Sequence, residues 1–545
     1  MKILVVIPAR GGSKGIPRKN VRLIAGHPLI SYAIGCVQKS SFDVDLVVSS
    51  DDEEIMHVAS VYGAEIVERP KELAGDSVTL DPVIFHAVNQ VEKQKGYTYD
   101  LVITMQPTSP KLSTITLDKA IRYMIEEDYD TVLSGVNDPR LSWKFENGEC
   151  VPNYKVRVNR QYMPKEVKET GAFVITKRQF VKNNSRFGKK ISIYEVPESE
   201  AGDIDTVSDW YVAEKELNKK IILIRLDGYQ EIGMGHIYRG LQLAYGFIEH
   251  DIRFVLSDKS ILGIEKIRKS FYKYDIIKED EDIITLIHKY KADIVINDIL
   301  NTSEDYIKKL KATGVRVINF EDIGTGALVA DATINALYEG VDTKNQFWGA
   351  DYYLIRDEFV IEKPKEFSEK VSEILVVFGG TDPNNLTKKT LDAILGIKQL
   401  DKINVTVILG MGYSKAEEIR KLCNENCAIS VVQDVKMMTD YMKKADIAIS
   451  SQGRTMLELA AMGVPTILMA QNEREAIHEF GEIKNGYLNL GNGSEVDEKT
   501  IRETIQWLIN CPQIRKNMQK QMLSRNLKMG MSRVKKIILG ESRYD

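Results

Sequence analysis

A glycine-rich, basic segment follows the first apolar run of the chain and has the residues needed to bind a polyphosphate. Residues 3–7 are apolar, and residues 10–20 then contain three glycines and four lysines or arginines. Glycines allow tight turns that bring backbone N–H groups close to phosphate oxygens, and the cations add fixed positive charge. The spacing matches neither the phosphate loop of P-loop NTPases nor a dinucleotide fingerprint, which argues against an ordinary ATPase or NAD enzyme. The alternative is a solvated glycine–lysine loop after a strand.

A second candidate site centres on a histidine that follows several glycines. Residues 221–226 are apolar, and Gly233, Gly235 and His236 come soon after them. Apolar residues at positions 237, 241, 244, 245 and 248 recur at helical spacing, which predicts a helix that begins near His236. A helix N-terminus disfavours the imidazolium, so a neutral histidine there remains available as a general base. The alternative is a histidine that only caps the loop.

Three short segments in the last third of the chain suit a nucleotide. Residues 379–381 follow a predicted strand and can wrap backbone N–H groups around a phosphate. Residues 450–453 precede a predicted helix, 455–462, whose N-terminus favours a diphosphate and whose Glu458 can accept hydrogen bonds from ribose hydroxyls. The third segment follows the predicted strand 466–469, at the carboxyl end where α/β sheets bind ligands. An ordinary turn is the alternative for the first segment. The candidate residues are Gly380, Thr381, Ser451, Gly453, Glu458 and Asn472.

Short apolar runs alternate with amphipathic stretches along the chain, which predicts α/β domains with mostly parallel sheets. A charged helix ends near residue 217, and a Pro-containing charged segment covers residues 362–370. We therefore predict domains at residues 1–217, 220–365 and 370–545. The predicted strands are residues 2–8, 46–49, 101–105, 131–136, 221–226, 254–256, 294–297, 315–320, 374–378, 405–409, 447–450 and 466–469.

The overall composition is that of an ordinary globular protein. The chain has 545 residues, 43% of them hydrophobic and 28% charged, with a net charge of −4 that gives no electrostatic case for nucleic acid or an anionic membrane. No apolar run is long enough to span a bilayer, and the first apolar stretch is too short for a signal peptide. Five scattered cysteines fit a reducing compartment. We therefore expect a cytoplasmic protein without nucleic-acid or membrane partners.

Further motifs follow the basic loop in a fixed order. They are Glu68-Arg69-Pro70, Gln106-Pro107-Thr108-Ser109-Pro110 and Gly202-Asp203-Ile204-Asp205-Thr206. Together with residues 8–20, they resemble the signature of the acylneuraminate cytidylyltransferase family, and the resemblance covers essentially all of residues 1–217. It implies a nucleotide-diphospho-sugar transferase-like Rossmann domain that transfers CMP from CTP to a sialic-acid-like (nonulosonic acid) sugar and releases pyrophosphate.

The same resemblance assigns roles to single residues. Arg10 and Lys19 would be the catalytic cations, and Arg69 and Gln106 would line the pocket for nucleotide and sugar. Residues 138–165 would form an excursion through which two copies of the chain associate, as in the family. The protein would then be a homodimer. The other nucleotide-binding candidates in the basic loop are Gly11, Gly12, Ser13, Lys14 and Asn20.

Asp203 and Asp205 would hold Mg²⁺ according to this resemblance. Residues two apart on an extended segment point the same way, so both carboxylates can meet one hard cation. The alternative is helix capping, because Thr206 and Asp209 have the spacing of a capping box before an apolar stretch. Both interpretations hold together if Thr206 caps the helix and the two aspartates stay free.

Two departures from the family concern the sugar and leave the CTP chemistry intact. The family's Arg-Pro-Asn-Gly run is replaced by Val-Lys-Glu-Thr-Gly at residues 167–171, and its Ser-Pro-Leu-Arg run by Ser-Pro-Lys-Leu at residues 109–112. The activated sugar is therefore expected to differ from sialic acid, with pseudaminic and legionaminic acid as bacterial-type candidates.

Matching stretches also cover most of residues 221–490. They are residues 232–239, 353–359, 379–386, 450–458 and Asn472. In order, they resemble the UDP-sugar hydrolases of pseudaminic acid synthesis, which have a two-domain glycosyltransferase-B-like fold. The resemblance makes His236 and Asn472 catalytic, with His236 activating water at the anomeric carbon of a UDP-amino sugar and Gly235 among the substrate contacts. One segment differs from the family's pattern. Residues 297–300 are Asn-Asp-Ile-Leu, where the family has Asp-His-Tyr-Gly.

These observations together predict a bifunctional α/β enzyme, a CMP-nonulosonate synthetase fused to a UDP-sugar hydrolase. Two alternatives for the second half stay open. It is either a glycosyltransferase or a catalytically inactive nucleotide-sugar-binding module that regulates the first half.

Overall fold

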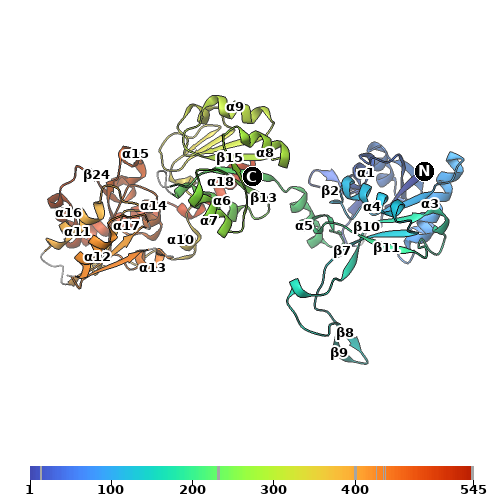
Figure 1. The fold of residues 1–545 in the computed structure, drawn as a ribbon, viewed down its shortest axis with the longest axis horizontal. Helices are drawn as coiled ribbons and strands as arrows, with labels where there is room; N and C mark the ends of the chain where they lie inside the picture. Colours follow the sequence, from blue (N-terminus) through green and yellow to red (C-terminus); the bar gives the residue numbers. More distant parts are fainter. Residues whose placement is uncertain are drawn as a thin grey trace. The chain divides into compact units, whose positions relative to one another are not determined.

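The chain divides into two units between Lys219 and Lys220 (Figure 1). Unit 1 is Met1–Lys219 and unit 2 is Lys220–Asp545. The structure, a computed structural model, describes residues 1–12, 15–229, 234–397, 402–410, 412–424, 426–433, 435 and 437–541. Across these described ranges, no helix is both long and apolar enough to cross a membrane.

Unit 1 is built on a seven-stranded sheet in the order β11-β7-β10-β6-β1-β4-β5. The central strand β1 (Ile3–Pro8) pairs in parallel with β6 (Leu101–Met105) and with β4 (Val44–Ser50). All of β1 is buried, which explains its continuous apolar run. β10 (Val167–Lys177) runs antiparallel to both β6 and β7 (Thr131–Asn137). Because β1 and β6 are parallel neighbours, the loops that follow them emerge at the same edge of the sheet.

Helices cover both faces of this sheet. The side chains of Ile3, Val5 and Ile7 pack in a core with α1 (Leu29–Gln38) and α4 (Thr114–Glu126), whereas Leu4 and Val6 pack with α3 (Leu80–Lys95). This alternation follows from the period-2 geometry of a strand. The other elements of unit 1 are β2 (Leu23–Ile24), β3 (His27–Pro28), α2 (Glu53–Val61), β5 (Glu65–Glu68), β8 (Trp143–Glu146), β9 (Glu149–Pro152), β11 (Ile191–Glu195) and α5 (Val207–Leu217).

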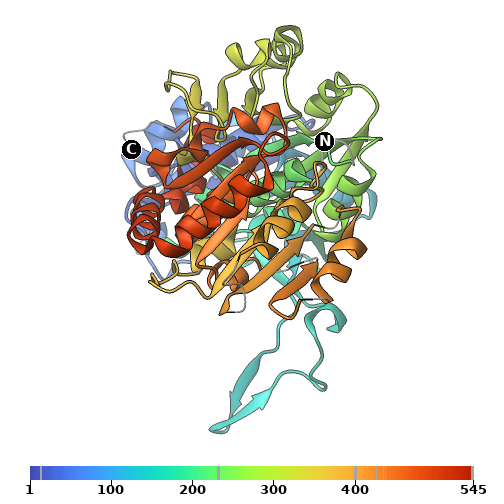
Figure 2. The same cartoon turned by 90° about the vertical axis from the view of Figure 1, so that its left-hand side faces the viewer.

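The β8–β9 hairpin projects from unit 1, to which two long connecting segments join it (Figures 1 and 2). Its aromatic side chains are open to solvent, with Trp143 53% and Phe145 82% exposed. This hairpin lies in the segment 138–165 for which dimerisation was expected, and that role stays a prediction.

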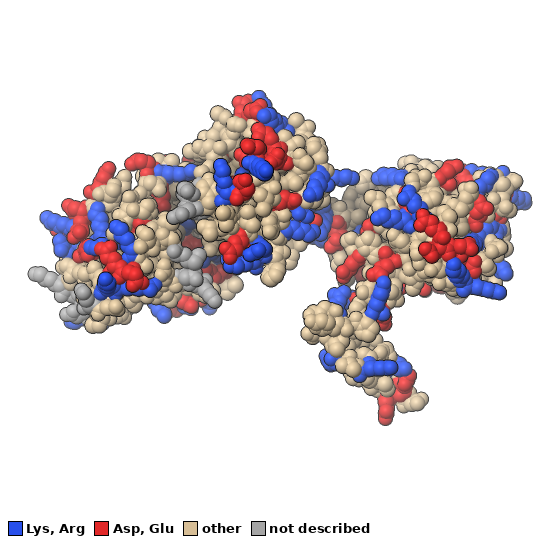
Figure 3. All heavy atoms as spheres, in the orientation of Figure 1, with Lys and Arg blue, Asp and Glu red and all other residues tan. Residues whose placement is uncertain are grey.

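Unit 2 contains two fully parallel sheets. The first has the order β14-β13-β12-β15-β16-β17-β18 and the second the order β21-β20-β19-β22-β23-β24. Figure 2 shows helices lying across the second sheet, and Figure 3 shows Lys and Arg interspersed with Asp and Glu on the face drawn. The first sheet comprises β12 (Ile221–Leu226), β13 (Asp251–Ser257), β14 (Lys273–Ile277), β15 (Ile294–Asp298), β16 (Arg316–Phe320), β17 (Ala332–Asn335) and β18 (Gln346–Trp348). The second comprises β19 (Glu373–Val377), β20 (Asn404–Leu409), β21 (Ile429–Gln433), β22 (Ile447–Ser450), β23 (Thr466–Ala470) and β24 (Tyr487–Asn492).

Helices connect these strands of unit 2, and three more helices, α16 to α18, follow the last strand β24. They are α6 (Gly235–Gly246), α7 (Ile261–Lys269), α8 (Asp282–Tyr290), α9 (Glu304–Ala312), α10 (Asp357–Ile361), α11 (Leu386–Leu395), α12 (Ala416–Asn424), α13 (Thr439–Met442), α14 (Thr455–Met462), α15 (Glu473–Ala476), α16 (Glu498–Asn510), α17 (Pro512–Ser524) and α18 (Gly530–Leu539).

Two features of unit 2 differ from the sequence-based expectation. The last helix, α18, packs on the first sheet, although residues 370–545 were expected to form the second domain. Val534 and Ile538 share a core with Ile222 of β12, and Arg316 donates hydrogen bonds to the carbonyl oxygens of Ile537 and Ile538 at 3.0 Å each. In addition, α6 ends at Gly246 and position 248 is 90% exposed, so the predicted apolar face is shorter than its spacing suggested.

Candidate functional site

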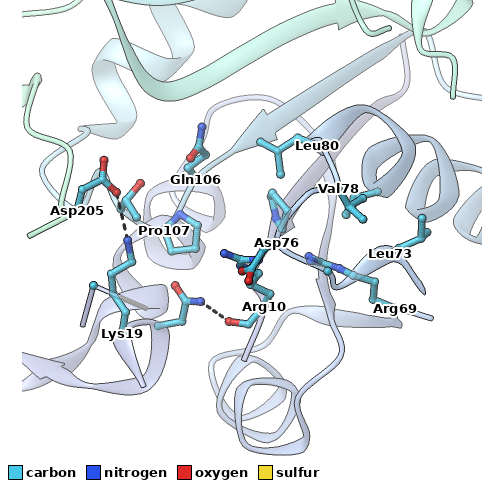
Figure 4. Close-up of a pocket in the computed structure, with 16 residues that line it drawn as sticks. Arg10, Lys19, Arg69, Leu73, Asp76, Val78, Leu80, Gln106, Pro107 and Asp205 are labelled. Atoms are coloured by element: carbon cyan, nitrogen blue, oxygen red, sulfur yellow. Dashed lines mark hydrogen bonds and ion pairs between the residues drawn. The ribbon is translucent and has the colours of Figure 1, made fainter. Parts of the chain in front are cut away.

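A cavity of about 410 Å³ lies at the edge of the unit 1 sheet where β1 and β6 end (Figure 4). It is lined by the basic loop, by the segment after β5, by the residues that follow β6 and by the acidic segment before α5. The sheet thus gathers residues that lie almost two hundred positions apart in sequence. The predicted residues that line it are Arg10, Lys19, Asn20, Arg69, Gln106 and Asp205.

Lys19 connects the basic loop to the acidic segment. Its ammonium group donates to the carbonyl oxygen of Ile204 at 2.8 Å and lies 3.5 Å from Asp205 Oδ1 (Figure 4). The side chain of Lys19 is only 14% exposed, whereas that of Asp205 is 74% exposed. The cation is therefore held in place at the cavity, and the carboxylate beside it stays accessible.

Arg10 reaches the cavity from the other side of the same loop. Its Nη1 lies 2.9 Å from Asp76 Oδ1, and its own carbonyl oxygen accepts a hydrogen bond from Asn20 Nδ2 at 3.1 Å (Figure 4). The buried Asn20 thus fixes the backbone that carries Arg10. A triphosphate can take the place of the Asp76 carboxylate as the anionic partner of this guanidinium.

Arg69 is a buried cation at the wall of the cavity. It is 5% exposed, and its Nη2 donates to the carbonyl oxygen of Ser49, at the end of β4, at 2.6 Å. Burial lowers the pKa of the guanidinium, and nearby Arg10 acts in the same direction. Anchoring to the sheet gives Arg69 one fixed orientation toward a nucleotide.

The glycines of the basic loop are needed for close packing. A Cβ on Gly11 would lie 2.5 Å from Asp52 Oδ2, and the Gly11 amide donates to Asp51 Oδ1 at 3.2 Å. A Cβ on Gly15 would lie 2.6 Å from the carbonyl oxygen of Asp205, so this glycine lets the loop touch the acidic segment. Gly12 has open space around it. The predicted residues Ser13 and Lys14 lie outside the described residues.

One predicted cation of the loop points elsewhere. Arg18 donates to the carboxylate of Glu54 through Nε at 3.0 Å and through Nη2, and its side chain is 70% exposed. Its φ of 58° places it in the left-handed region at the start of a short 3₁₀ turn. Arg18 therefore forms an ion pair at the surface and does not join the phosphate-binding cations that the sequence suggested.

The helix-capping interpretation of the acidic segment is confirmed, and the Mg²⁺ site stays a prediction. Thr206 caps α5, with Asp209 completing a capping box, so Asp203 and Asp205 are not needed for the helix. Partial burial of the Asp203 carboxyl raises its pKa, and the charge of Asp205 raises it further. Two neighbouring carboxylates of this kind fit Mg²⁺, which commonly binds one or two carboxylates together with substrate phosphates. Within the described parts of the chain, no cluster of three or more His, Cys, Asp or Glu side chains forms a metal cage.

Gly171 lies where the sequence departs from the acylneuraminate motif. Its φ is +71°, and a Cβ there would lie 3.1 Å from Gln106 Nε2 and 3.8 Å from Asp203 Oδ2. The strand β10 therefore brings Gly171, within the departing motif, against Gln106, which lines the cavity.

A buried histidine–aspartate pair forms the core of the candidate site in unit 2. His236 is the second residue of α6, and its Nδ1 lies 2.6 Å from Asp298 Oδ1 at the end of β15. Burial alone would raise the pKa of Asp298, but the charges of Arg239 and His236 hold it well below its usual range. The carboxylate therefore accepts the Nδ1 proton, which leaves the Nε2 lone pair of His236 available as a base.

Arg239 extends this pair into a buried ionic network. Its Nε donates to Asp298 Oδ2 at 2.6 Å, its Nη2 donates to Oδ1, and its Nη1 donates to Glu321 Oε1 at 3.2 Å. Burial raises the pKa of Glu321, which has a left-handed φ of +51°. Buried groups in such a sparsely populated conformation concentrate at functional sites, so the network marks a built site and not a random ion pair.

The nucleotide-binding candidates of unit 2 gather at the carboxyl edge of its second sheet. The loop at Gly380 and Thr381 is exposed, and its Asp382 accepts hydrogen bonds from the amides of Leu386 at 2.9 Å and Thr387 at 2.8 Å. Gln471, which follows β23, donates to the same aspartate at 2.7 Å and so ties the two loops together. Ser451 and Gly453 lie between β22 and α14.

Two predicted residues have structural partners in the described protein. Asn472 is exposed and caps α15, accepting the Glu475 amide at 3.0 Å. Glu458 is buried, its pKa is raised by burial, and its Oε1 accepts a hydrogen bond from Arg356 Nε at 2.9 Å. The free carboxylate expected for ribose recognition is thus an ion-paired one.

Comparison with known proteins decides the class of unit 1. Residues 4–212 match the family profile described as cytidylyltransferase. The pseudaminic acid cytidylyltransferase of Campylobacter jejuni is 33% identical over 219 residues, which cover 38% of this chain and 93% of that protein. The chain belongs to the cytidylyltransferase family.

The cytidylyltransferase carries a second recognisable region. Residues 374–529 match the profile described as glycosyltransferase family 28 C-terminal domain. An uncharacterized protein of Methanocaldococcus jannaschii is 30% identical over 335 residues, which cover 54% of this chain and 67% of that protein. Among solved structures, MurG of Acinetobacter baumannii is similar, with 14% identity and a TM-score of 0.47 over 59% of this chain and 99% of that chain. The two family matches confirm the expected resemblances to a cytidylyltransferase and to a glycosyltransferase-like unit.

Sequence reasoning missed several charged residues of the cytidylyltransferase's second unit. Asp298 was noted only as part of a departing motif, Arg239 and Arg454 only as parts of matching stretches, and Glu321 was not considered. A signal existed for two of them, because Arg239 lies one helical turn after His236 and Asp298 ends a predicted strand. Nothing local distinguishes the other two from surface charges.

Proposed function

We propose that unit 1 transfers CMP from CTP to the anomeric hydroxyl of a nonulosonic acid and releases pyrophosphate. The observation that supports this most directly is the 410 Å³ cavity, in which cations of the basic loop face the acidic segment. In the reaction the sugar hydroxyl oxygen attacks the α-phosphorus and loses its proton to water, the bond to the bridging oxygen of the β-phosphate breaks, and pyrophosphate leaves. Positioning and neutralisation of charge suffice for such chemistry.

Each residue of the cavity then has a defined task. Lys19 and Arg10 hold the triphosphate and neutralise the charge that moves to the leaving pyrophosphate. Arg69 and Gln106 orient the nucleotide and the sugar. Mg²⁺ would be held by Asp203 and Asp205 and would supply further neutralisation of phosphate charge.

Unit 2 hydrolyses a UDP-amino sugar in this proposal. His236 Nε2 accepts a proton from water, the water oxygen bonds to the anomeric carbon, and the bond to UDP breaks with its electron pair moving to the phosphate. Asp298 holds the imidazole in the tautomer that this step requires, as the 2.6 Å contact and the lowered pKa of Asp298 indicate. Asn472, exposed at the start of α15, would contact the sugar.

A glycosyltransferase is the second candidate for unit 2. The match of residues 374–529 to a glycosyltransferase domain supports it. The same His236 would then deprotonate an acceptor hydroxyl instead of water, so the dyad fits both reactions.

One experiment tests the proposal and separates the candidates. The full chain is incubated with CTP and a panel of nonulosonic acids, and pyrophosphate release is measured. In parallel, UDP release from UDP-amino sugars is followed with and without sugar acceptors. We expect UDP and free sugar without acceptor. UDP release that depends on an acceptor would establish the glycosyltransferase, and no CMP-sugar with any acid would overturn the assignment of unit 1. His236→Asn should lower UDP release and leave CMP-sugar synthesis unchanged.

A further inference from the structure

Arg454 links the nucleotide side of unit 2 to the catalytic histidine. It follows the loop after β22, at the first turn of α14, and its Nη1 donates to the carbonyl oxygen of Gly235. Gly235 opens α6 and directly precedes His236. Although 219 positions separate the two residues, this hydrogen bond brings a guanidinium next to the residue that carries the proposed base.

Gly235 has no side chain, and this leaves room for the guanidinium against its backbone. A Cβ at position 235 would lie 2.7 Å from Arg454 Nη1 and 3.0 Å from its Cζ. Contacts below 3.0 Å essentially never occur at real Cβ atoms, so any other residue would displace the planar group. The glycine that the sequence nominated for substrate contact thus has a different task, since it lets Arg454 approach.

The charge of Arg454 is poorly compensated by the protein. Asp298 and Glu321, whose negative charges act on Arg454, are already bonded to Arg239. Burial lowers the pKa of Arg454, and the charge of Arg239 lowers it further. A guanidinium has five N–H donors, and among the described residues Arg454 uses one of them, toward Gly235. An anion with several acceptor oxygens would satisfy the others.

Two further polar atoms around the same loop lack a partner. Ser450 Oγ, at the end of β22, and His478 Nε2 are buried without a hydrogen-bond partner in the described protein. His478 Nδ1 donates to the carbonyl oxygen of Gln452 at 2.8 Å, so Nε2 of the neutral imidazole is an acceptor. The Ser450 hydroxyl can donate to an anionic oxygen. Buried polar groups are normally satisfied, so these atoms point to a ligand with both hydroxyls and anionic oxygens. A nucleoside diphosphate has both.

We propose that Arg454 binds the diphosphate of a nucleotide sugar and, through Gly235, places it opposite His236. This inference rests on the proposed function of unit 2. When the bond between sugar and phosphate breaks, the electron pair moves to the leaving phosphate, and Arg454 neutralises the charge that develops there. The same contact joins the two α/β domains of unit 2, and it would thereby align the nucleotide with the base.

Binding of UDP, UMP and uridine to the full chain tests this inference. The variants are Arg454→Met, Arg454→Lys and Gly235→Ala, which displaces the guanidinium without removing it. Arg502→Met is a matched control, because its guanidinium also lies against a glycine, Gly396, with a Cβ distance of 2.3 Å to Nη1, between α16 and α11. Thermal unfolding of unit 2 reports whether each variant is folded, and CTP binding shows that unit 1 is intact.

We expect Arg454→Met to weaken UDP binding about 10- to 100-fold, because charge-assisted hydrogen bonds are lost, while uridine binding changes less than about twofold. Arg454→Lys should recover part of the affinity, and Gly235→Ala should weaken UDP binding more than uridine binding. If Arg454→Met does not fold, these two variants decide the question. Unchanged UDP affinity, or an equal loss for UDP and uridine, would overturn the role of Arg454 and leave the proposed function standing. If the wild-type protein bound no UDP, both would fall.

Discussion

Replacing Asp298 with asparagine removes the charge that holds His236 while keeping the size of the side chain. In the native protein the carboxylate lies 2.6 Å from His236 Nδ1 and accepts a hydrogen bond from Arg239 Nε at 2.6 Å. An amide places its acceptor oxygen at only one of these two positions and an NH2 donor at the other, so it cannot accept from both partners where they lie. The imidazole then loses its fixed tautomer, and its proton can occupy Nε2, where the base needs a lone pair.

The expected loss of activity is that of a general base. Such a base contributes about 100- to 10,000-fold to a rate, so the turnover number for UDP release should fall within that range with little change in UDP affinity. Removing one partner from a buried ion pair costs about 3–5 kcal/mol. A typical domain has about 5–15 kcal/mol of stability, so unit 2 should still fold, with a lower unfolding temperature.

The same substitution should alter the response of unit 2 to acid. The pKa of Asp298 is lower in the folded protein than in the unfolded chain, where it is about 4. The ionised group therefore stabilises the fold above pH about 4, and this stabilisation is lost as the pH falls through the folded pKa. Wild-type unit 2 should lose stability in acid more steeply than Asp298→Asn.

Steady-state UDP release and chemical unfolding at several pH values measure both effects. Asp275→Asn is the control, because this β14 carboxylate also pairs with an arginine, at 3.0 Å from Arg253 Nη1, but lies outside the proposed site. It should leave turnover unchanged. Wild-type turnover in a folded Asp298→Asn protein would refute the idea that Asp298 orients the base.

The remaining predictions concern unit 1 and the boundary. Replacing Asp203 and Asp205 with alanine should abolish Mg²⁺-dependent pyrophosphate release without unfolding the unit, and undiminished turnover would remove the metal assignment. Because the pKa of Asp203 is raised, apparent Mg²⁺ affinity in the native protein should decrease as the pH falls toward that pKa. Gly171→Ala introduces a Cβ 3.1 Å from Gln106 Nε2 at a φ of +71°, so KM for the sugar should rise about tenfold while KM for CTP stays constant. A cut after Lys219 should give two soluble halves, each with its own activity by the same assays; insolubility of both would disprove their independence.

Local patterns in the sequence were sufficient for much of the framework. The expected strands 101–105, 221–226 and 447–450 coincide with β6, β12 and β22, because continuous apolar runs of that length suit buried parallel strands. The capping box at Thr206 and the start of a helix at His236 also follow from residues a few positions apart. Such features depend on neighbours in the chain, so one sequence is enough to predict them.

Arrangements that depend on partners across a sheet were beyond the sequence. β10 inserts antiparallel between β6 and β7 and brings Gly171 against the cavity-lining Gln106, yet no residue in that strand specifies its direction. The last helix returns to the first sheet of unit 2, where its apolar face packs in the core around Ile222. The burial of apolar surface stabilises any packed pair of complementary faces, whatever their separation along the chain.

The sequence by itself determined which residue types were available for phosphate, metal and proton-transfer chemistry, and it indicated two catalytic units. Only the tertiary structure decided which charges meet. His236 and Asp298 are 62 residues apart, yet the parallel pairing of β12 with β15 places the Asp298 carboxylate beside the start of α6. The Asp298 carboxylate is buried, and a charge in a low-dielectric interior requires a partner. The fold supplies two partners, His236 and Arg239.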